Sequence, residues 1–207
     1  MYNGCRTQVL TSKMKAGLRN QISKRWSGSL GFSMPAAKQL KQVCKLPLLE
    51  KSSTGQIKTI WSEYHKDHQY AIGDIIKSSE ADSLLNHARK WPMFVFPVRK
   101  EGGYFTLVSQ WQRNHCLMTY LEDYKLNPNA AQPWCIFSLY NELAETKGIT
   151  LIRAEVFLSK MSKDDGEQLL RLVKRFYLGD KKHTDLLHTF AKEPKHFDFQ
   201  KLIALCA

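Results

Sequence analysis

Two histidines, His65 and His68, lie three positions apart and have the spacing of a helical metal-binding pair. On a helix this spacing places both imidazoles on one side, but a metal site in a protein takes three or four ligands. No cysteine completes the set, because the five cysteines, at positions 5, 44, 116, 135 and 206, form no CxxC pair. We therefore expect both histidines on an exposed helix surface and no metal site.

Other reactive side chains have simpler explanations than catalysis. Cys116 and Cys135 lie in apolar sequence, where a buried thiol is the expected role. Asp164, Asp165 and Glu167 come at the start of a helix, where the helix dipole favours acidic residues. The sequence has no glycine-rich phosphate loop and no GxSxG or HExxH pattern. We predict a binding scaffold rather than an enzyme, with no catalytic residue and no cofactor.

The net charge of +12 comes mainly from the N-terminal region. Residues 1–49 contain nine basic and no acidic residues, which leaves 22 basic and 19 acidic residues in the remainder. An apolar stripe with a spacing of four runs through the basic segment: Leu10, Met14, Leu18, Ile22 and Trp26. A basic, serine-rich, amphipathic N-terminus is typical of a mitochondrial transit peptide. A nucleic-acid arm, a membrane-surface helix and a solvated extension are the alternatives.

These features predict a location in the mitochondrial matrix, with cleavage between Trp26 and Pro35. Gly28, Gly31 and Pro35 mark a linker over residues 27–45. The longest apolar run, Met93 to Phe96, is far shorter than the roughly 20 residues that span a bilayer. We therefore expect a transit peptide and linker over residues 1–45, one domain over residues 46–207, and no stable membrane insertion.

The elements that position the candidate residues follow from periodicity. A helix begins after residues 52–54, and its expected inner side is Ile57, Ile60, Trp61 and Tyr64. Further helices are expected over 78–90, 137–147 and 162–178 and from Thr184, and strands over 70–76, 94–98, 104–111, 115–121 and 149–158. Glycines at 102 and 103 favour a hairpin. The fold class is α+β, with one mainly antiparallel sheet covered by helices.

Three segments also resemble one known family. They are the helix from Gln56 to His65, the hairpin from Pro92 to Gln112, and the stretch from Leu139 to Ile149 followed by Ala154 and Glu155. Together they resemble the mitochondrial assembly factors that chaperone the beta subunit of the ATP synthase catalytic head. The resemblance implies a non-catalytic protein that binds the free beta subunit, prevents its aggregation and hands it over to alpha. It implies no role for nucleic acid.

The other function that we consider is RNA binding. Tyr104, Phe105, Trp111 and Tyr120 are sheet aromatics of the kind that stack on bases. The basic residues that would accompany them, Arg99, Lys100 and Arg113, are few and lie at turns. RNA binding by a basic arm and these aromatics is therefore the alternative to the chaperone.

Alternation along the strand from Tyr104 to Gln112 suggests where a partner would bind. Phe105, Leu107, Ser109 and Trp111 form the more apolar side, which we expect to face the covering helices. The other side is mixed, as in a surface that is soluble alone and binds an apolar patch. The predicted partner-facing residues are Tyr104, Gln110 and Gln112 on the strand and Arg99 and Glu101 beside the turn. The alternative is that these side chains only face water.

Overall fold

A computed structural model describes residues 38–206, which form a six-stranded antiparallel sheet and helices on both of its faces. The strand order is β1-β6-β5-β4-β3-β2. The strands are β1 (Ala71–Lys77), β2 (Met93–Lys100), β3 (Gly103–Gln112), β4 (His115–Tyr120), β5 (Pro133–Tyr140) and β6 (Ile149–Val156). The predicted α+β class is confirmed. The predicted transit peptide and its cleavage site lie outside the described residues.

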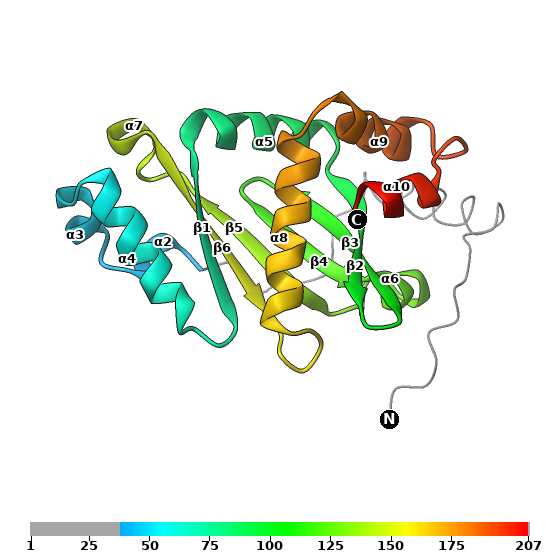
Figure 1. The fold of residues 1–207 in the computed structure, drawn as a ribbon, viewed down its shortest axis with the longest axis horizontal. Helices are drawn as coiled ribbons and strands as arrows, with labels where there is room; N and C mark the ends of the chain where they lie inside the picture. The colour runs from blue at the N-terminus through cyan, green and yellow to red at the C-terminus, as the bar shows by residue number, and fades with distance from the viewer. Residues whose placement is uncertain (1–37, 207) are drawn as a thin grey trace.

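The larger helical layer covers one face of the sheet. It contains α5 (Ser78–Lys90), α8 (Lys163–Leu178), α9 (Lys181–Lys192) and α10 (Phe199–Leu205). Figure 1 shows α8 running across the sheet, with β1 on one side of it and β2 on the other. The main core lies between this layer and the sheet, where Phe94 and Phe96 of β2 pack on Phe176 of α8 with ring centroids 5.2 and 5.8 Å apart.

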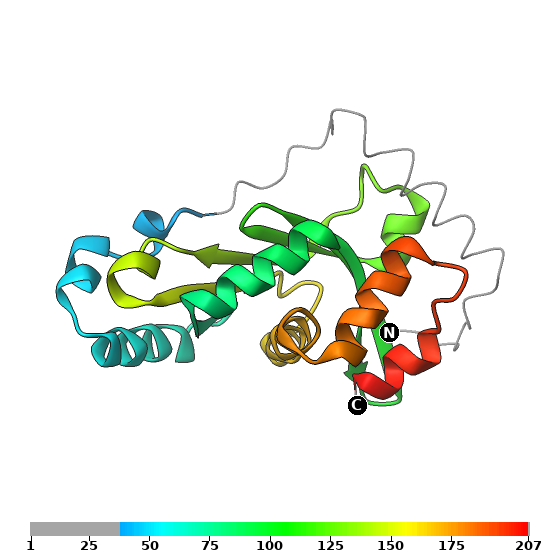
Figure 2. The ribbon, with the colours of Figure 1, turned by 90° about the horizontal axis from the view of Figure 1, so that it is seen from above.

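The opposite face is covered at its β1–β6 end by three helices: α2 (Leu40–Val43), α3 (Leu46–Lys51) and α4 (Thr54–Lys66). A second, smaller core lies beneath them and includes Leu40, Ile57, Trp61 and Leu151. Figure 2 shows this group at the opposite end of the molecule from α9 and α10. The two remaining helices of the described chain are short, α6 (Leu121–Leu126) and α7 (Ala144–Lys147).

Local sequence signals explain where most elements begin and end. Ser162 and Asp165 form a capping box at the start of α8, as its acidic first turn predicts. The β2–β3 turn uses Gly102 at φ +79°, and α7 ends at Gly148 at φ +68°, both in the left-handed region that glycine tolerates. Arg113 adopts φ +54° in the β3–β4 turn, which is unusual for a residue with a side chain.

Residues 137–140 are the clearest error in the predicted elements. The predicted helix over 137–147 is wrong for this part, because Phe137, Leu139 and Tyr140 belong to β5. Only residues 144–147 are helical, and the predicted end at Lys147 before Gly148 is confirmed. β5 lies between β4 and β6 and is buried on both faces, so its sequence is apolar without alternation. Periodicity does not separate such a run from a buried helix.

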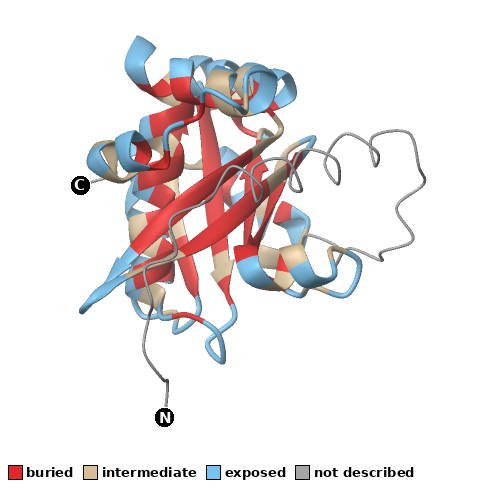
Figure 3. Ribbon diagram, turned by 90° about the vertical axis from the view of Figure 1, so that its right-hand side faces the viewer, coloured by how far each residue is buried: buried red, intermediate tan, exposed pale blue. Residues whose placement is uncertain are grey.

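The described part of the expected linker is folded. Leu40 is buried in the second core, and the Lys38 ammonium lies 2.8 Å from the Glu155 carboxylate. Figure 3 shows that the buried residues follow the strands and the inner sides of the helices, while the hairpin ends and outer helix surfaces are exposed. Between residues 38 and 206 no helix is both long and apolar enough to cross a membrane.

Candidate partner-binding surface

The β2–β3 hairpin carries the five predicted partner residues but divides them into two groups. Arg99 lies opposite Tyr104, next to the turn that holds Glu101. Gln110 and Gln112 lie toward the other end of β3, roughly 20–27 Å from Tyr104 along the strand. Arg99, Glu101 and Gln112 are exposed, whereas Tyr104 and Gln110 are half-buried. The structure does not bring the five into one site, and their contact with a partner stays a prediction.

The middle of the predicted partner side of β3 is not accessible. Thr106 and Val108 are 8% and 1% exposed, so the expectation of a continuous mixed surface is wrong there. Their cross-strand neighbours on β2 are Pro97 and Val95, which are also buried. The side predicted to face the helices is confirmed at Trp111, whose ring lies 5.6 Å from that of Tyr177 on α8.

The sheet aromatics that suggested RNA binding pack against other rings of the protein. Tyr104 lies 5.9 Å from Phe199 of α10, and Trp111 is buried. Tyr120 stacks on Trp134 at 4.7 Å, and Phe105 contacts the same indole at 5.5 Å. A base-stacking platform needs exposed ring faces. These contacts weigh against the RNA-binding interpretation.

Helix α4 presents a different surface from the one that its periodicity predicts. Its buried residues are Ile57, Trp61 and His65, whereas Ile60 and Tyr64 are 48% and 47% exposed. The prediction of an inner side containing Ile60 and Tyr64 was therefore wrong. The reason is that α4 approaches β1 closely over Gly73, where an added Cβ would lie within 2.8 Å of both Trp61 and His65. Trp61 and His65 pack in this contact, so Ile60 and Tyr64, on the adjacent side of the helix, face outward.

His65 is buried as well, against the prediction of an exposed histidine, because it accepts a hydrogen bond from a buried arginine. Its Nε2 lies 2.8 Å from Nη1 of Arg153, and its Nδ1 lies 2.8 Å from the Trp61 carbonyl oxygen. A guanidinium only donates, so Nε2 is unprotonated and Nδ1 donates to the carbonyl. Burial, together with the charges of Arg153, His68 and Lys163, lowers the pKa of His65 to about 4.

The arginine also joins the N-terminal end of the described chain to β6. Arg153 Nη2 lies 3.1 Å from Glu155, which in turn binds Lys38 at 2.8 Å. Burial raises the pKa of Glu155, but Lys38 and Arg153 outweigh it, so the pKa falls below its ordinary value. Lys163 donates to the carbonyl oxygens of His65, Lys66 and His68 and so caps the end of α4. No three metal-ligating side chains gather anywhere in the described part of the chain.

Three exposed residues and one half-buried histidine form what we term the α4 patch: Ile60, Tyr64 and Tyr70, with His68 between the two tyrosines. Ile60 and Tyr64 are neighbours one turn apart on the helix. The His68 ring contacts Tyr64 at 5.7 Å and Tyr70 at 4.4 Å, so the patch is continuous from α4 to the start of β1. Sequence reasoning missed this surface. A signal was present, since one stripe of Ile57, Trp61 and His65 already gives α4 a buried side.

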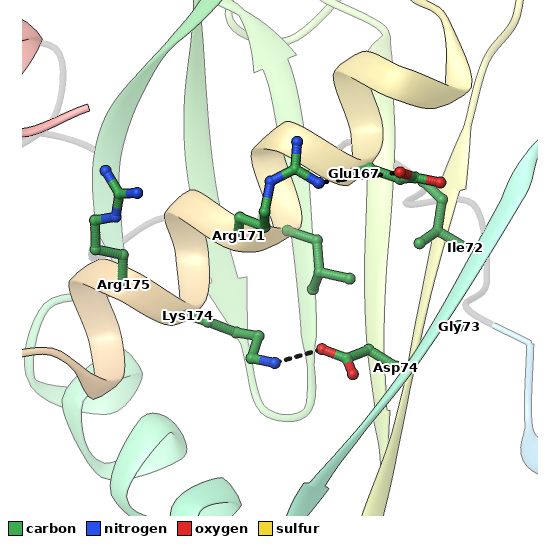
Figure 4. Close-up of a pocket in the computed structure, with 8 residues that line it drawn as sticks. Ile72, Gly73, Asp74, Glu167, Arg171, Lys174 and Arg175 are labelled. Atoms are coloured by element: carbon green, nitrogen blue, oxygen red, sulfur yellow. Dashed lines mark hydrogen bonds and ion pairs between the residues drawn. The ribbon is translucent and has the colours of Figure 1, made fainter. Parts of the chain in front are cut away.

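A separate cleft opens between β1 and α8 (Figure 4). Its volume is about 490 Å³. Ile72 and Leu170 supply its apolar lining, and Gly73 exposes main chain to it. Lys174 forms an ion pair with Asp74 at 2.6 Å, and Arg171 lies 3.9 Å from Glu167. Arg175 also lines the cleft, and its guanidinium donates to the Leu205 carbonyl oxygen at 3.0 Å, away from Asp74. The lining therefore contains three basic and two acidic residues.

Comparison with known sequences identifies relatives along most of the chain. A sequence model of the family described as ATP11 protein matches residues 7–203. The ATP synthase mitochondrial F1 complex assembly factor 1 of Homo sapiens is 29% identical over 170 residues, and that of Mus musculus is 30% identical over 179. The mitochondrial protein atp11 of Schizosaccharomyces pombe is 30% identical over 172 residues.

The coverage of these matches is unequal. The aligned segments include 81%, 85% and 74% of this chain but only 51%, 54% and 57% of the human, mouse and yeast proteins, respectively. The chain therefore spans about half the length of the curated relatives that it matches.

Proposed function

Because the chain belongs to the ATP11 protein family, we propose that it is a non-catalytic assembly chaperone of the mitochondrial F1 complex. In this proposal it binds the free beta subunit in the matrix, prevents its aggregation and releases it to alpha. The observation that carries the proposal is the family match over residues 7–203, together with relatives that are named F1 complex assembly factors.

Physical chemistry supports this role. A subunit that awaits its neighbour exposes an apolar interface, and such surfaces aggregate. A chaperone that covers this interface needs exposed aromatic and aliphatic side chains with a polar surround. The α4 patch provides Ile60, Tyr64 and Tyr70 on the surface of the described chain. Displacement by alpha needs no nucleotide hydrolysis if alpha binds beta more tightly.

Light scattering of purified beta subunit on dilution from denaturant tests the proposal. The protein should suppress scattering at a near-equimolar ratio, and addition of alpha should release it from beta, as gel filtration would show. An unrelated aggregating enzyme serves as the control client. Equal protection of both clients, or none of beta, would contradict the proposal. An apolar interface should also persist at high salt, whereas RNA affinity would fall steeply.

Paired variants then test the surface. Changing both Ile60 and Tyr64 to Ser should weaken protection of beta, because half-exposed apolar side chains are removed without opening the core. Leu126→Ser is the matched control, since Leu126 is 85% exposed on α6. Arg99→Ala with Glu101→Ala tests the predicted hairpin contacts in the same assay.

N-terminal sequencing of protein from mitochondria tests the transit peptide, which should be cleaved between Trp26 and Pro35.

A further inference from the structure

The free edge of β1 has main-chain groups that face away from the sheet. Val156 N–H donates to Tyr70 C=O at 2.8 Å, and Ser78 N–H donates to Gly148 C=O at 2.9 Å. In an antiparallel ladder the main-chain groups of successive residues point alternately toward and away from the neighbouring strand. The N–H and C=O groups of residues 72, 74 and 76 therefore bond to β6, and those of residues 71, 73, 75 and 77 point outward. β1 is the terminal strand of the sheet, so these outward groups meet no further strand of the described chain.

Side chains occupy only part of this edge. The Ile75 N–H donates to the Asp74 carboxylate at 2.8 Å, and the Lys77 N–H donates to Glu80 at 2.8 Å. Ala71 is fully buried, whereas Gly73, Asp74 and Ile75 are accessible. No hydrogen bond within residues 38–206 reaches the outward N–H or C=O of Gly73. Gly73 and Asp74 also line the cleft beside α8 (Figure 4), so the open main chain and the basic side chains share one surface.

We propose that the edge of β1 at residues 73–75, together with Arg171 and Lys174 of α8, binds an extended acidic segment of the partner as an added strand. This rests on the proposed function for the identity of the partner, and it adds the conformation and charge of the segment. The main-chain groups of Gly73 and Ile75 pair with the incoming strand. An incoming carboxylate takes the place of Asp74 beside Lys174, and Asp74 then leaves the Ile75 N–H.

Charge selects this occupant over the chain's own N-terminal segment. Residues 1–37 carry six basic and no acidic residues, the same sign as the cleft. The Arg171 side chain is 67% exposed and its carboxylate neighbour, Glu167, is 3.9 Å away, so it is accessible to a second acidic group. The apolar side chains of Ile72 and Leu170 suit the alternate residues of a strand, which point to one side.

A seven-residue peptide of alternating Val and Glu, labelled with fluorescein, is a direct probe. Fluorescence anisotropy should show binding of this peptide and at least tenfold weaker binding of a Val and Lys version. Two further peptides carry N-methyl groups on alternate amides, one on each edge of the strand. One of the two should bind at least tenfold more weakly and the other within about twofold of the parent, since only one edge of an added strand pairs. Equal binding by both would overturn the proposal.

Variants of the protein provide the second test. Arg171→Glu with Lys174→Glu should weaken peptide binding by about tenfold, whereas Lys181→Glu with Lys192→Glu on α9 changes the net charge equally and should leave it unchanged. Both proteins should keep a cooperative melting transition. If the α8 variant unfolds, Arg171→Gln with Lys174→Gln replaces it. An equal loss of peptide binding in both variants would show a general charge effect and overturn the proposal. A dimer in sedimentation that the peptide dissociates would also overturn it, because a second copy of the chain would then occupy the edge.

The beta-subunit assay separates this inference from the proposed function. If the wild-type protein does not protect beta, the proposed function fails whatever the peptide does. If the wild type protects beta and the α8 variant protects it equally, the function stands and the β1 site is wrong. The expected result is protection by the wild type and the α9 variant and reduced protection by the α8 variant.

Discussion

The two edge strands of the sheet, β1 and β2, both lie against α8 but differ in how their outward amides are covered. On β2 the outward positions include Pro97, which has no N–H, and Arg99, whose N–H donates to the Gln168 side chain of α8. On β1 the carboxylates of Asp74 and Glu80 accept hydrogen bonds from the outward N–H groups of Ile75 and Lys77, and no described side chain bonds to the outward main-chain groups of Gly73. An unprotected edge is a template for another strand. The outward edge of β2 is therefore blocked in part by covalent structure, at Pro97, whereas the edge of β1 is blocked only by side chains that can rotate away.

The largest effect that we expect concerns the contact that holds β1. Gly73→Val should destabilise the protein by about 3 kcal/mol, because even a Cβ at this position would lie 2.4 Å from His65. Denaturant unfolding measures the change. Gly55→Ala is the control, since the nearest atom to a Cβ there is Ser53 Oγ at 4.0 Å, and helix propensity favours alanine. A loss below about 1 kcal/mol for Gly73→Val would show that β1 and α4 separate easily.

The second prediction concerns the pH dependence of the same contact. The pKa of His65, about 4, is below its ordinary value, so the unfolded chain binds a proton at a higher pH than the folded protein does. The contribution of neutral His65 to the free energy of unfolding is therefore complete above about pH 6.5. It is lost as the pH falls toward 4, by up to about 1.4 kcal/mol per pH unit. His65→Gln keeps an acceptor for Arg153 and should flatten this part of the profile. Parallel profiles for both proteins would show that His65 does not cause the loss.

A smaller effect is expected at the β2 side, on the hairpin. Tyr104→Ala should reduce stability by about 1–2 kcal/mol, because its half-buried ring packs on Phe199 of α10. Gln112→Ala, at an exposed position of the same strand, should stay within about 0.5 kcal/mol of the wild type. Thermal melting and protection of beta are measured together. Unchanged melting with weakened protection in Tyr104→Ala would instead support its predicted role as a partner contact.

The smallest effect on stability, and the direct test of the two edges, is at Pro97. Pro97→Ala should cost only about 0.5–1 kcal/mol, since the proline lies in an edge strand with its nitrogen pointing outward. The double variant Pro97→Ala with Gln168→Ala has two outward N–H groups on β2 without a partner, at position 97 and at Arg99. Sedimentation should then show self-association that Gln168→Ala alone does not produce. A double variant that stays monomeric would show that α9 and α10 protect this edge without the proline.

The sequence predicts those elements that have a second signal besides an apolar run, such as a cap, a turn glycine or, for β6, β-branched residues. The α8 helix has one apolar side and a Ser162 cap, and the β2–β3 hairpin has glycines at its turn, so both were placed correctly. β5 was not, because a strand buried on both faces has no alternation. The short helices α2, α3 and α6 have too few turns to show a period.

The site was less predictable than the fold for a physical reason. Whether Ile60 and Tyr64 face inward depends on how closely α4 approaches β1, and this is set by the missing side chain of Gly73, far along the chain. The burial of His65 likewise depends on Arg153, on a strand that joins the sheet much later. Local periodicity contains neither fact. The net charge beside β1 comes from Arg171, Lys174 and Arg175 of α8, and their place next to β1 depends on how α8 crosses the sheet.

The strand order has a consequence for how the protein acquires its structure. Each strand from β2 to β5 is bonded to the next strand in the sequence, so contacts between near neighbours along the chain build this part of the sheet. β1 is the exception, because Ala71 pairs with Glu155 and Lys77 with Ile149, and the four other strands lie between them in the sequence. A chain that emerges N-terminus first therefore carries β1 unpaired until β6 arrives, and closing so long a loop slows folding. The edge that we propose for the partner is thus built by the last pairing to form, at the step most exposed to wrong partners.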